Sequence, residues 1–266
     1  MPPPRTAFNR SPLIRTLASL DRHPGADVAA ASQTLAERLG QWLHWPDAIS
    51  LYGVLDGEPA AHQPGDAPAR APVAASVLAA ELRHLRQQLA LSIADDAALA
   101  AELAELAEQA ELAEQADQAE QTERSGNAAQ TDWAPCRRRH LALQQAMGAR
   151  TAPLRASLRA ILQARSPALA RLAALDAVLE AALAERERHL LAKVPRLLEQ
   201  HFTRLSQAQA RAQTQTAQAA APATPRLQPD TLRQTLQRLL LDELDLRLQP
   251  LEGLLLALQQ DKPATT

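Results

Sequence analysis

Forty residues from Ser166 to Leu205 carry leucine at helical intervals, and this segment constrains the fold more than any other feature of the sequence. Spacings of three and four residues place the leucines on one face of an α-helix. At about 1.5 Å per residue, a continuous helix of this length would span roughly 60 Å, longer than a compact small domain. Ser166 and Pro167 are suited to cap and begin the helix, and Pro195 predicts a kink in it. We therefore expect a long amphipathic helix that needs neighbours along its length.

The remaining residues favour helices as well. Ala, Leu, Gln, Arg and Glu dominate, aromatic residues make up 2%, and only eight glycines occur in 266 residues. These common residues lose little side-chain freedom in a helix, and no segment has the character of a strand. The predicted fold is all-α: an elongated antiparallel helical bundle, coiled-coil-like, with long kinked helices and disordered linkers.

Changes in composition divide the chain into segments. We predict N-terminal helices over 1–56, a linker over 57–72, a helix running into an acidic low-complexity repeat over 73–130, a central long-helix hairpin over 131–212, a linker over 213–228, C-terminal helices over 229–260 and a tail over 261–266. Pro153 is expected to interrupt or kink its helix, and Pro250 to begin a second short helix. Three rows of apolar residues are expected on buried faces: Val77, Leu78, Leu82, Leu85 and Leu89; Leu169, Leu172, Leu179, Leu183, Leu190, Val194, Leu197 and Leu205; and Leu232, Leu236, Leu239, Leu240, Leu244 and Leu248.

Charge is distributed unevenly along the chain. Residues 95–123 hold ten acidic and no basic residues, whereas residues 124–266 hold 20 basic against 12 acidic residues. The acidic repeat has a period of three, so alanine and glutamate wind around every side of the helix. Its leucine row, from Leu99 through Leu103 to Leu106, does not continue far enough for a strong coiled coil. We expect a solvated helix that frays at its far end.

The motifs of common enzyme classes are missing. There is no glycine-rich phosphate loop, G-x-S-x-G elbow, H-E-x-x-H pair or C-x-x-C pair. Cys136 precedes three arginines, which can lower the pKa of a thiol, but an incidental thiol near a helix start is the favoured interpretation. Glu185 and His189 lie four residues apart and suit a solvated pair better than a metal site. Asp176 is expected to pair with an arginine across a helix interface. The sequence indicates no catalytic residue, cofactor or metal.

Two groups are candidate partner-binding residues. Trp42 and Trp45 flank a turn at Pro46; they either pin the N-terminal helices onto the bundle or anchor a partner. Asp47 is expected to cap the helix that follows. Arg137, Arg138 and Arg139 form the only dense basic cluster and indicate a solvated helix face, a clasp for the acidic repeat or, less favoured, a nucleic-acid contact.

Three segments together resemble a known family. They are "AERLGQWLHWPDAISLYGVL" (36–55), "RSPALARLAALDAVLEAALAERERHLLAKVPRLLEQHF" (165–202) and "LLLDELDLRLQPLEGLLLAL" (239–258). They are similar to a proteobacterial family known only as a domain of unknown function, number 3348. That family has no established activity, so the resemblance implies no catalytic residue. Its gene context implies a cytoplasmic partner of an envelope assembly.

The favoured function is a non-enzymatic helical adaptor or scaffold that associates with another helical protein or with itself. A nucleic-acid-associated protein using the basic C-terminal half, and a helical-bundle enzyme or metalloprotein, are the alternatives. The lone cysteine, the lack of a secretory signal and the lack of a long apolar run predict a cytoplasmic location.

Overall fold

The described residues form α-helices and no strand, which confirms the predicted all-α class. The computed structural model describes residues 11–20, 41–56, 71–106, 108, 133–216 and 229–261. Its helices are α1 (Pro12–Leu20), α3 (Trp45–Asp56), α4 (Ala71–Ala94), α6 (Ala134–Arg165), α7 (Pro167–Leu191), α8 (Val194–Thr216) and α9 (Pro229–Gln260). A further helical segment covers residues 97–106. The far end of the acidic repeat, most of the predicted helix before Trp42 and most of both predicted linkers lie outside the described residues.

The helices α6 and α7 form a hairpin that turns at Ser166. Ser166 has an extended backbone, and its hydroxyl accepts a 3.4 Å hydrogen bond from the backbone N–H of Leu169. Pro167 occupies the first position of α7, where a missing N–H costs no hydrogen bond. The predicted start of this helix is therefore confirmed. Arg155 bonds to Asp176 across their interface, and these two residues lie at similar distances in sequence before and after the turn. The two helices therefore run antiparallel.

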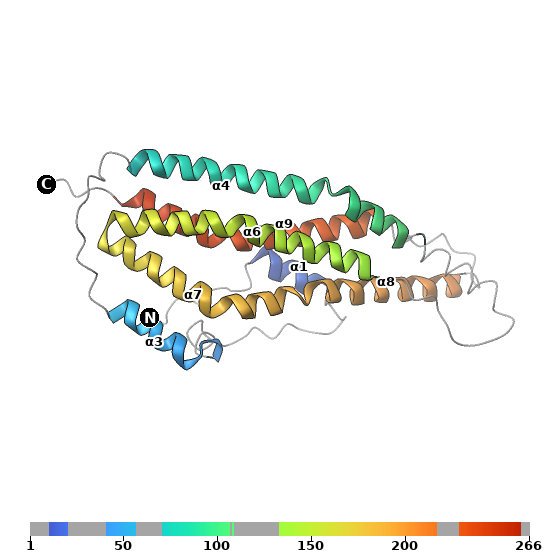
Figure 1. Cartoon of the computed structure of the whole chain (residues 1–266). Coiled ribbons are helices and arrows are strands. Elements are labelled where there is room, and N and C mark those ends of the chain that lie inside the picture. The colour runs from blue at the N-terminus through green and yellow to red at the C-terminus, as the bar shows by residue number, and fades with distance from the viewer. Residues whose placement is uncertain are drawn as a thin grey trace, which may run out of the picture.

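The helices α4 and α9 pack against each other and against α6 (Figure 1). Gln144 on α6 bonds to Glu243 on α9, and Arg165 near the end of α6 bonds to Asp261 just beyond α9, so these two helices run in parallel. The helix α4 runs antiparallel to α9 and α6. Gln237 and Arg233 on α9 donate hydrogen bonds of 2.9 and 3.2 Å to the carbonyl oxygen of Ala94, and these bonds tie the end of α4 to the early part of α9.

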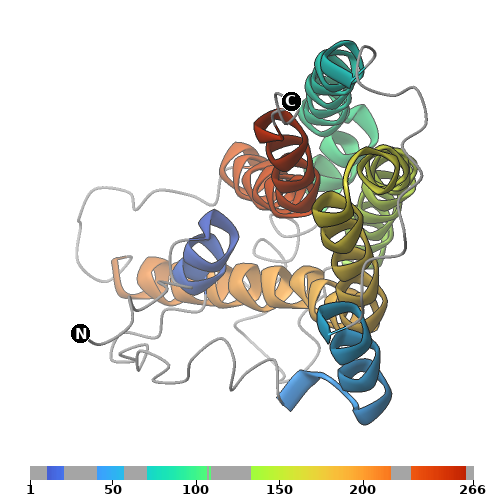
Figure 2. The ribbon, with the colours of Figure 1, turned by 90° about the vertical axis from the view of Figure 1, so that its left-hand side faces the viewer.

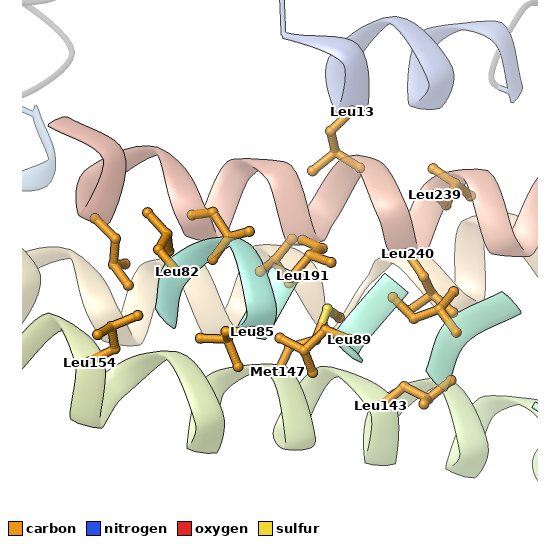
Figure 3. Packing of buried hydrophobic residues seen from close by; sticks show 14 of the residues in the cluster. Leu13, Leu82, Leu85, Leu89, Leu143, Met147, Leu154, Leu191, Leu239 and Leu240 are labelled. Carbon is orange, nitrogen blue, oxygen red and sulfur yellow. The ribbon is translucent and has the colours of Figure 1, made fainter. Parts of the chain in front are cut away.

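Leucines from four helices meet in a common core. All six residues of the apolar row predicted on α9 are buried, and four further leucines continue it: Leu251, Leu254, Leu255 and Leu258. Figure 3 shows Leu82, Leu85 and Leu89 of α4 in one cluster with Met147 of α6 and Leu240 of α9. Leu99, Leu103 and Leu106 are also buried, so the start of the acidic repeat packs into this core. Fully burying one leucine contributes about 1.5–3 kcal/mol.

The predicted rows need corrections on α4, α7 and α8. Leu172, Leu179, Leu183 and Leu197 are only half-buried, Leu198 is the buried neighbour of Leu197, and the side chain of Leu205 lies outside the described residues. Val77 is exposed, and Ala75 takes its place beside Leu78 on the buried face of α4. Leu190 is also exposed, whereas Leu191 is buried. The difference at Leu190 follows from the register of α7 itself, because Leu191 lies 18 residues, or five helical turns, after the buried Ala173 and therefore on the same side of the helix.

The three prolines for which a break or kink was predicted do not all have the same effect. Before Pro195 the chain breaks into two helices through a turn at residues 192–193, so the segment is interrupted rather than kinked. Pro153 and Pro250 lie inside α6 and α9, which continue through them. The expectation that Pro250 begins a second helix is therefore wrong. Each proline removes one backbone hydrogen bond, and the packing of a 32-residue helix on its neighbours offsets that loss.

Two shorter helices lie on the outside of this core. The helix α3 contacts α7, and α1 contacts α8 and α9. Figure 2 shows α1 between α8 and α9, with α3 beside α7. Within the described ranges, no helix is both long enough and apolar enough to cross a lipid bilayer.

Candidate interaction surface on α3

The N-terminus of α3 is capped by a carboxylate from its own first turn. Trp45 is the first helical residue, and the side chain of Asp47 accepts a 3.0 Å hydrogen bond from the backbone N–H of His44. This backward bond is the acidic half of a capping box. Asp47 therefore caps the helix from inside its first turn, because the helix begins at Trp45, three residues before the start that a cap at Asp47 predicts.

One side of α3 carries large apolar side chains that face solvent. Trp45, Ile49, Tyr52 and Leu55 have exposed fractions of 79, 56, 66 and 59%. The first three are spaced at i, i+4 and i+7, so they lie in one row on the helix. We call these four residues the α3 apolar face. No side chain of α3 is fully buried, so the helix adds little to the core.

The opposite side of α3 is half-buried. Asp47, Leu51 and Val54 follow the same i, i+4, i+7 spacing and are all less exposed than the apolar face. Since α3 contacts α7, this side is the one that holds the helix on the protein. The arrangement inverts the usual order, in which the larger apolar side chains of a surface helix face the core.

Tyr52 is held in place along the helix. Its hydroxyl donates a 2.7 Å hydrogen bond to the carboxylate of Asp56, one turn further on. This hydrogen bond raises the pKa of Tyr52 above its ordinary value, so the phenol stays protonated at neutral pH. The contact limits the motion of the ring and leaves its face open.

Trp42 and Trp45 have different environments. Trp42 is half-buried, and the guanidinium carbon of Arg186 on α7 lies 4.9 Å from the centre of its ring. This is a cation–π geometry. Trp42 thus has the contact expected of a residue that pins the N-terminal segment, whereas Trp45 has the exposure expected of a partner-binding residue.

The basic cluster on α6 is only partly available to solvent. Arg137 and Arg138 are exposed. Arg139 donates a 2.8 Å hydrogen bond to the buried carboxylate of Asp96, whose other oxygen accepts from the backbone N–H of Leu99. Asp96 therefore caps the helical segment 97–106, and Arg139 holds its start against α6. Figure 1 shows the beginning of α6 at the opposite end of the protein from α3, so the two groups of candidate residues do not form one site.

In the described part of the chain, the surroundings of the cysteine and of the Glu-x-x-His pair do not suit a chemical site. Cys136 is buried, and burial raises its pKa to about 12, which leaves the thiol protonated and unreactive. Glu81 and His84 have the Glu-x-x-His spacing of helical di-metal sites, but both are exposed and His84 is hydrogen-bonded to Gln88. Among the described residues, no group of three His, Cys, Asp or Glu is placed to hold a metal ion.

Of the α3 apolar face, only Trp45 was predicted from the sequence. Ile49, Tyr52 and Leu55 extend the row that begins at Trp45, and that i, i+4, i+7 spacing was the signal available in the sequence. A buried polar cluster around Glu243 was also missed, because its partner Gln144 lies 99 residues away in sequence.

These features define an all-α protein with a leucine core and an aromatic helix face directed at solvent. The chain belongs to the family described as protein of unknown function (DUF3348), whose model matches residues 1–260. The match confirms the resemblance noted in three segments and extends it over nearly the whole chain. Neither the search of curated proteins nor that of solved structures finds a match.

Proposed function

We propose that this protein is a non-enzymatic helical adaptor whose α3 apolar face binds a helix of another protein. The observation that carries the proposal is the exposure of Trp45 and Tyr52 in one row on a helix that contributes little to the core. Tryptophan and tyrosine are the side chains most enriched among residues that dominate binding energy. A monomeric protein rarely leaves such a row uncovered without an interaction that uses it.

The shape and charge of α3 suggest what binds there. A row of side chains at i, i+4 and i+7 suits a second helix, because ridges of side chains on one helix fit grooves on another. The helix α3 contains Asp47 and Asp56 and no basic residue. An apolar partner helix flanked by lysine or arginine is therefore the best complement.

A photo-crosslinking experiment tests the proposal. The photoreactive residue p-benzoylphenylalanine replaces Ile49 in the protein expressed in its native host, and crosslinked partners are identified by mass spectrometry. The partner is then purified, and its affinity for wild-type protein and for the Trp45→Ala/Tyr52→Ala variant is measured. We expect the double substitution to weaken binding about 30-fold or more, since a residue that dominates binding contributes about 2 kcal/mol or more.

Leu256 supplies the matched control. It is an exposed leucine on α9, with an exposed fraction of 53% close to that of Ile49. Crosslinking from position 256 should not recover the same protein, and Leu256→Ala should leave the affinity unchanged. Equal affinities of wild-type and W45A/Y52A protein for every crosslinked partner would contradict the proposal. A concentration-dependent dimer that W45A/Y52A abolishes would replace the foreign helix with a second copy of the chain.

The nucleic-acid alternative has less support. Several arginines of the basic half form ion pairs with carboxylates: Arg139, Arg155, Arg159, Arg165 and Arg247. Arginines engaged in this way are poorly available to phosphates. Binding to DNA or RNA would have to weaken steeply with salt, and a salt-sensitive mobility shift that is lost in the Arg137→Ala/Arg138→Ala variant would favour this alternative.

A cytoplasmic location is part of the proposal. The single cysteine is buried and unpaired, as suits a reducing compartment. The envelope-assembly idea adds one expectation: the protein crosslinked at position 49 should fractionate with membranes. Recovery of only soluble proteins would argue against that part and leave the adaptor proposal intact.

A further inference from the structure

The joint between α7 and α8 leaves one backbone carbonyl without its helical donor. The chain turns at residues 192–193, and Pro195 lies in the first turn of α8. In a continuous helix the N–H of residue 195 would bond to the carbonyl oxygen of Leu191, but proline has no N–H. The side chain of Gln144 on α6 supplies a donor instead, with its Nε2 atom 3.3 Å from that oxygen. A side chain of another helix therefore holds the end of α7.

The same nitrogen of Gln144 serves two further acceptors inside the core. It donates to the carboxylate of Glu243 at 2.7 Å, and it lies 3.2 Å from Nε2 of His140, one turn earlier on α6. An amide nitrogen carries two hydrogens, so three acceptors compete for two donors. All three side chains belong to buried residues, and Nδ1 of His140 has no hydrogen-bond partner among the described residues. The hydrogen bonding of this cluster is therefore incomplete.

The helix α8 covers His140. Trp133, two turns before His140, stacks on Phe202 of α8 at 5.6 Å, and Gln144, one turn after it, contacts Leu191. The segment from Leu191 to Phe202 therefore runs over His140. The main contacts of α8 are with α6 and α1, and Figure 1 shows its far end extending beyond the start of α6. Movement of α8 at the joint would admit water to His140 and leave the packing of α4, α6 and α9 in place.

We propose that the joint between α7 and α8 is a hinge that opens in acid, with Gln144 as the latch and His140 as the group that releases it. A protonated His140 carries hydrogen on both ring nitrogens, so its Nε2–H faces the amide hydrogens of Gln144 across 3.2 Å instead of accepting one. The amide then turns away and Leu191 loses its donor. The helix α8 moves off α6 at residues 192–193.

The charged groups around His140 do not compensate a proton on its ring. They are Glu243 and Arg247 on α9, Glu187 on α7, Glu102 and Asp96 at the helical segment 97–106, Arg139 on α6 and His201 on α8. Arg247 donates to Glu243 at 3.0 and 2.8 Å and so neutralises the nearest carboxylate. Asp96 is paired with Arg139. His201 donates from Nδ1 to the backbone oxygen of Leu20, a bond that it can make in either charge state.

The direction of the pH effect follows from burial. Burial lowers the pKa of His140 to about 4 in the closed form. Once α8 has moved, water restores the ordinary histidine pKa of about 6.5. The open form therefore binds the proton more tightly than the closed form does. Opening is favoured as the pH falls from about 6.5 to 4, and between pH 7 and pH 5 the ratio of open to closed protein rises about 20-fold.

Hydrogen exchange on the full chain tests the hinge, because it detects openings that are rarely populated. Mass spectrometry follows the amides of residues 197–204 on α8 and 244–251 on α9 at pH 7 and pH 5, and each rate is divided by the intrinsic rate at that pH. We expect α8 to be less protected than α9, and its protection to fall about 20-fold at pH 5. Urea below the unfolding transition should leave α8 exchange unchanged, since opening the hinge exposes little surface compared with global unfolding.

Non-titrating variants separate the proton from other effects of acid. In His140→Leu protein the protection of α8 should change less than about twofold between the two pH values. His189 is exposed near the end of α7, so His189→Leu is the matched control and should retain the 20-fold fall. If circular dichroism shows that His140→Leu protein does not fold, His140→Gln takes its place, since glutamine is polar and does not titrate.

The variant Gln144→Met tests the latch, because it keeps the length of the side chain and removes the amide. The helix α8 should then open about tenfold more often at pH 7, again without dependence on urea. Equal protection of α8 and α9, an equal pH response in the wild type and in the non-titrating variant, or unchanged α8 protection in Gln144→Met protein would each overturn the proposal. The W45A/Y52A variant should exchange as the wild type does, so the hinge and the α3 apolar face can fail separately.

Discussion

The side-chain amide of Gln144 on α6 donates a 2.7 Å hydrogen bond to the carboxylate of Glu243 on α9, inside the leucine core. The other oxygen of Glu243 accepts two hydrogen bonds from Arg247, at 3.0 and 2.8 Å. Burial raises the pKa of Glu243 above its ordinary value, although Arg247 acts in the opposite direction. A polar contact of this kind stabilises one register of two leucine-rich helices, since a shifted register would leave the groups unpaired.

Removing the carboxylate of Glu243 should therefore destabilise the folded protein. We expect Glu243→Ala to lower the free energy of unfolding by about 3–5 kcal/mol, because it removes the carboxylate that accepts from both Gln144 and Arg247 inside the core. Glu252 on the same helix is the control: it pairs with Arg86 at the surface, and Glu252→Ala should cost less than about 1 kcal/mol. Urea unfolding of both variants measures the difference. A small loss for Glu243→Ala would show that the buried pair does not stabilise this packing.

The neighbouring histidine makes stability depend on pH. Burial lowers the pKa of His140 to about 4, and its Nδ1 atom has no hydrogen-bond partner. Below the ordinary histidine pKa of about 6.5 the unfolded chain binds a proton at this residue, whereas the folded chain does not. The free energy of unfolding therefore falls as the pH drops from about 6.5 to 4. At pH 5 this loss is about 2 kcal/mol relative to pH 7.

The variant His140→Leu isolates that effect. Glu243 acts in the opposite sense, since its raised pKa lets the folded chain keep a proton to a higher pH and so favours the folded state in acid. The change in stability between pH 7 and pH 5 should be about 2 kcal/mol more unfavourable for the wild type than for His140→Leu. Identical pH profiles for the two proteins would mean that His140 is not held neutral.

The α6–α7 hairpin offers a comparison between two carboxylates in one network. Asp176 accepts hydrogen bonds from Arg155 and Arg159, as predicted, and Glu180 pairs with the same two arginines. The side chain of Asp176 is 13% exposed and that of Glu180 36%. The contacts with the two arginines hold the pKa of Asp176 below its ordinary value despite its burial.

Asp176→Ala should destabilise the protein by about 2–3 kcal/mol, and Glu180→Ala by about 1 kcal/mol or less. The contribution of Asp176 is present above its ordinary pKa and is lost as the pH falls toward the lowered one. Chemical unfolding at pH 7 and at pH 3 measures both effects. Equal losses for the two substitutions at pH 7 would contradict the ranking.

The fold class and most of the core follow from the sequence for a simple reason. On α9 one leucine row runs without interruption, so helical periodicity alone identified every residue of that row as buried. On α7 the same rule misplaced Leu190, because the buried side is marked by Leu169 and the small residue Ala173, and Leu191 rather than Leu190 is in register with Ala173. Pro250 shows the converse: a residue that opposes helix formation is overridden by packing on both sides of it.

The candidate site was less accessible to sequence reasoning. The row from Trp45 to Tyr52 has the period of a buried face, and period cannot distinguish a face that meets the core from one that meets solvent. That choice depends on α7, which contacts the side carrying Leu51 and Val54. The burial of Glu243 could not be predicted for a related reason, since its partner on α6, Gln144, is 99 residues away in sequence.

Two pairs of aromatic residues test whether the α3 apolar face serves binding rather than folding. The rings of Trp133 and Phe202 stack at 5.6 Å between α6 and α8, and Phe202 is buried. Phe202→Ala should lower the free energy of unfolding by about 3–5 kcal/mol. The exposed pair Trp45 and Tyr52 should behave differently, with less than about 0.5 kcal/mol lost for each alanine substitution. Thermal and urea unfolding measure both; a large loss at Trp45 or Tyr52 would mean that the face contributes to folding, and its assignment to a partner would lose its basis.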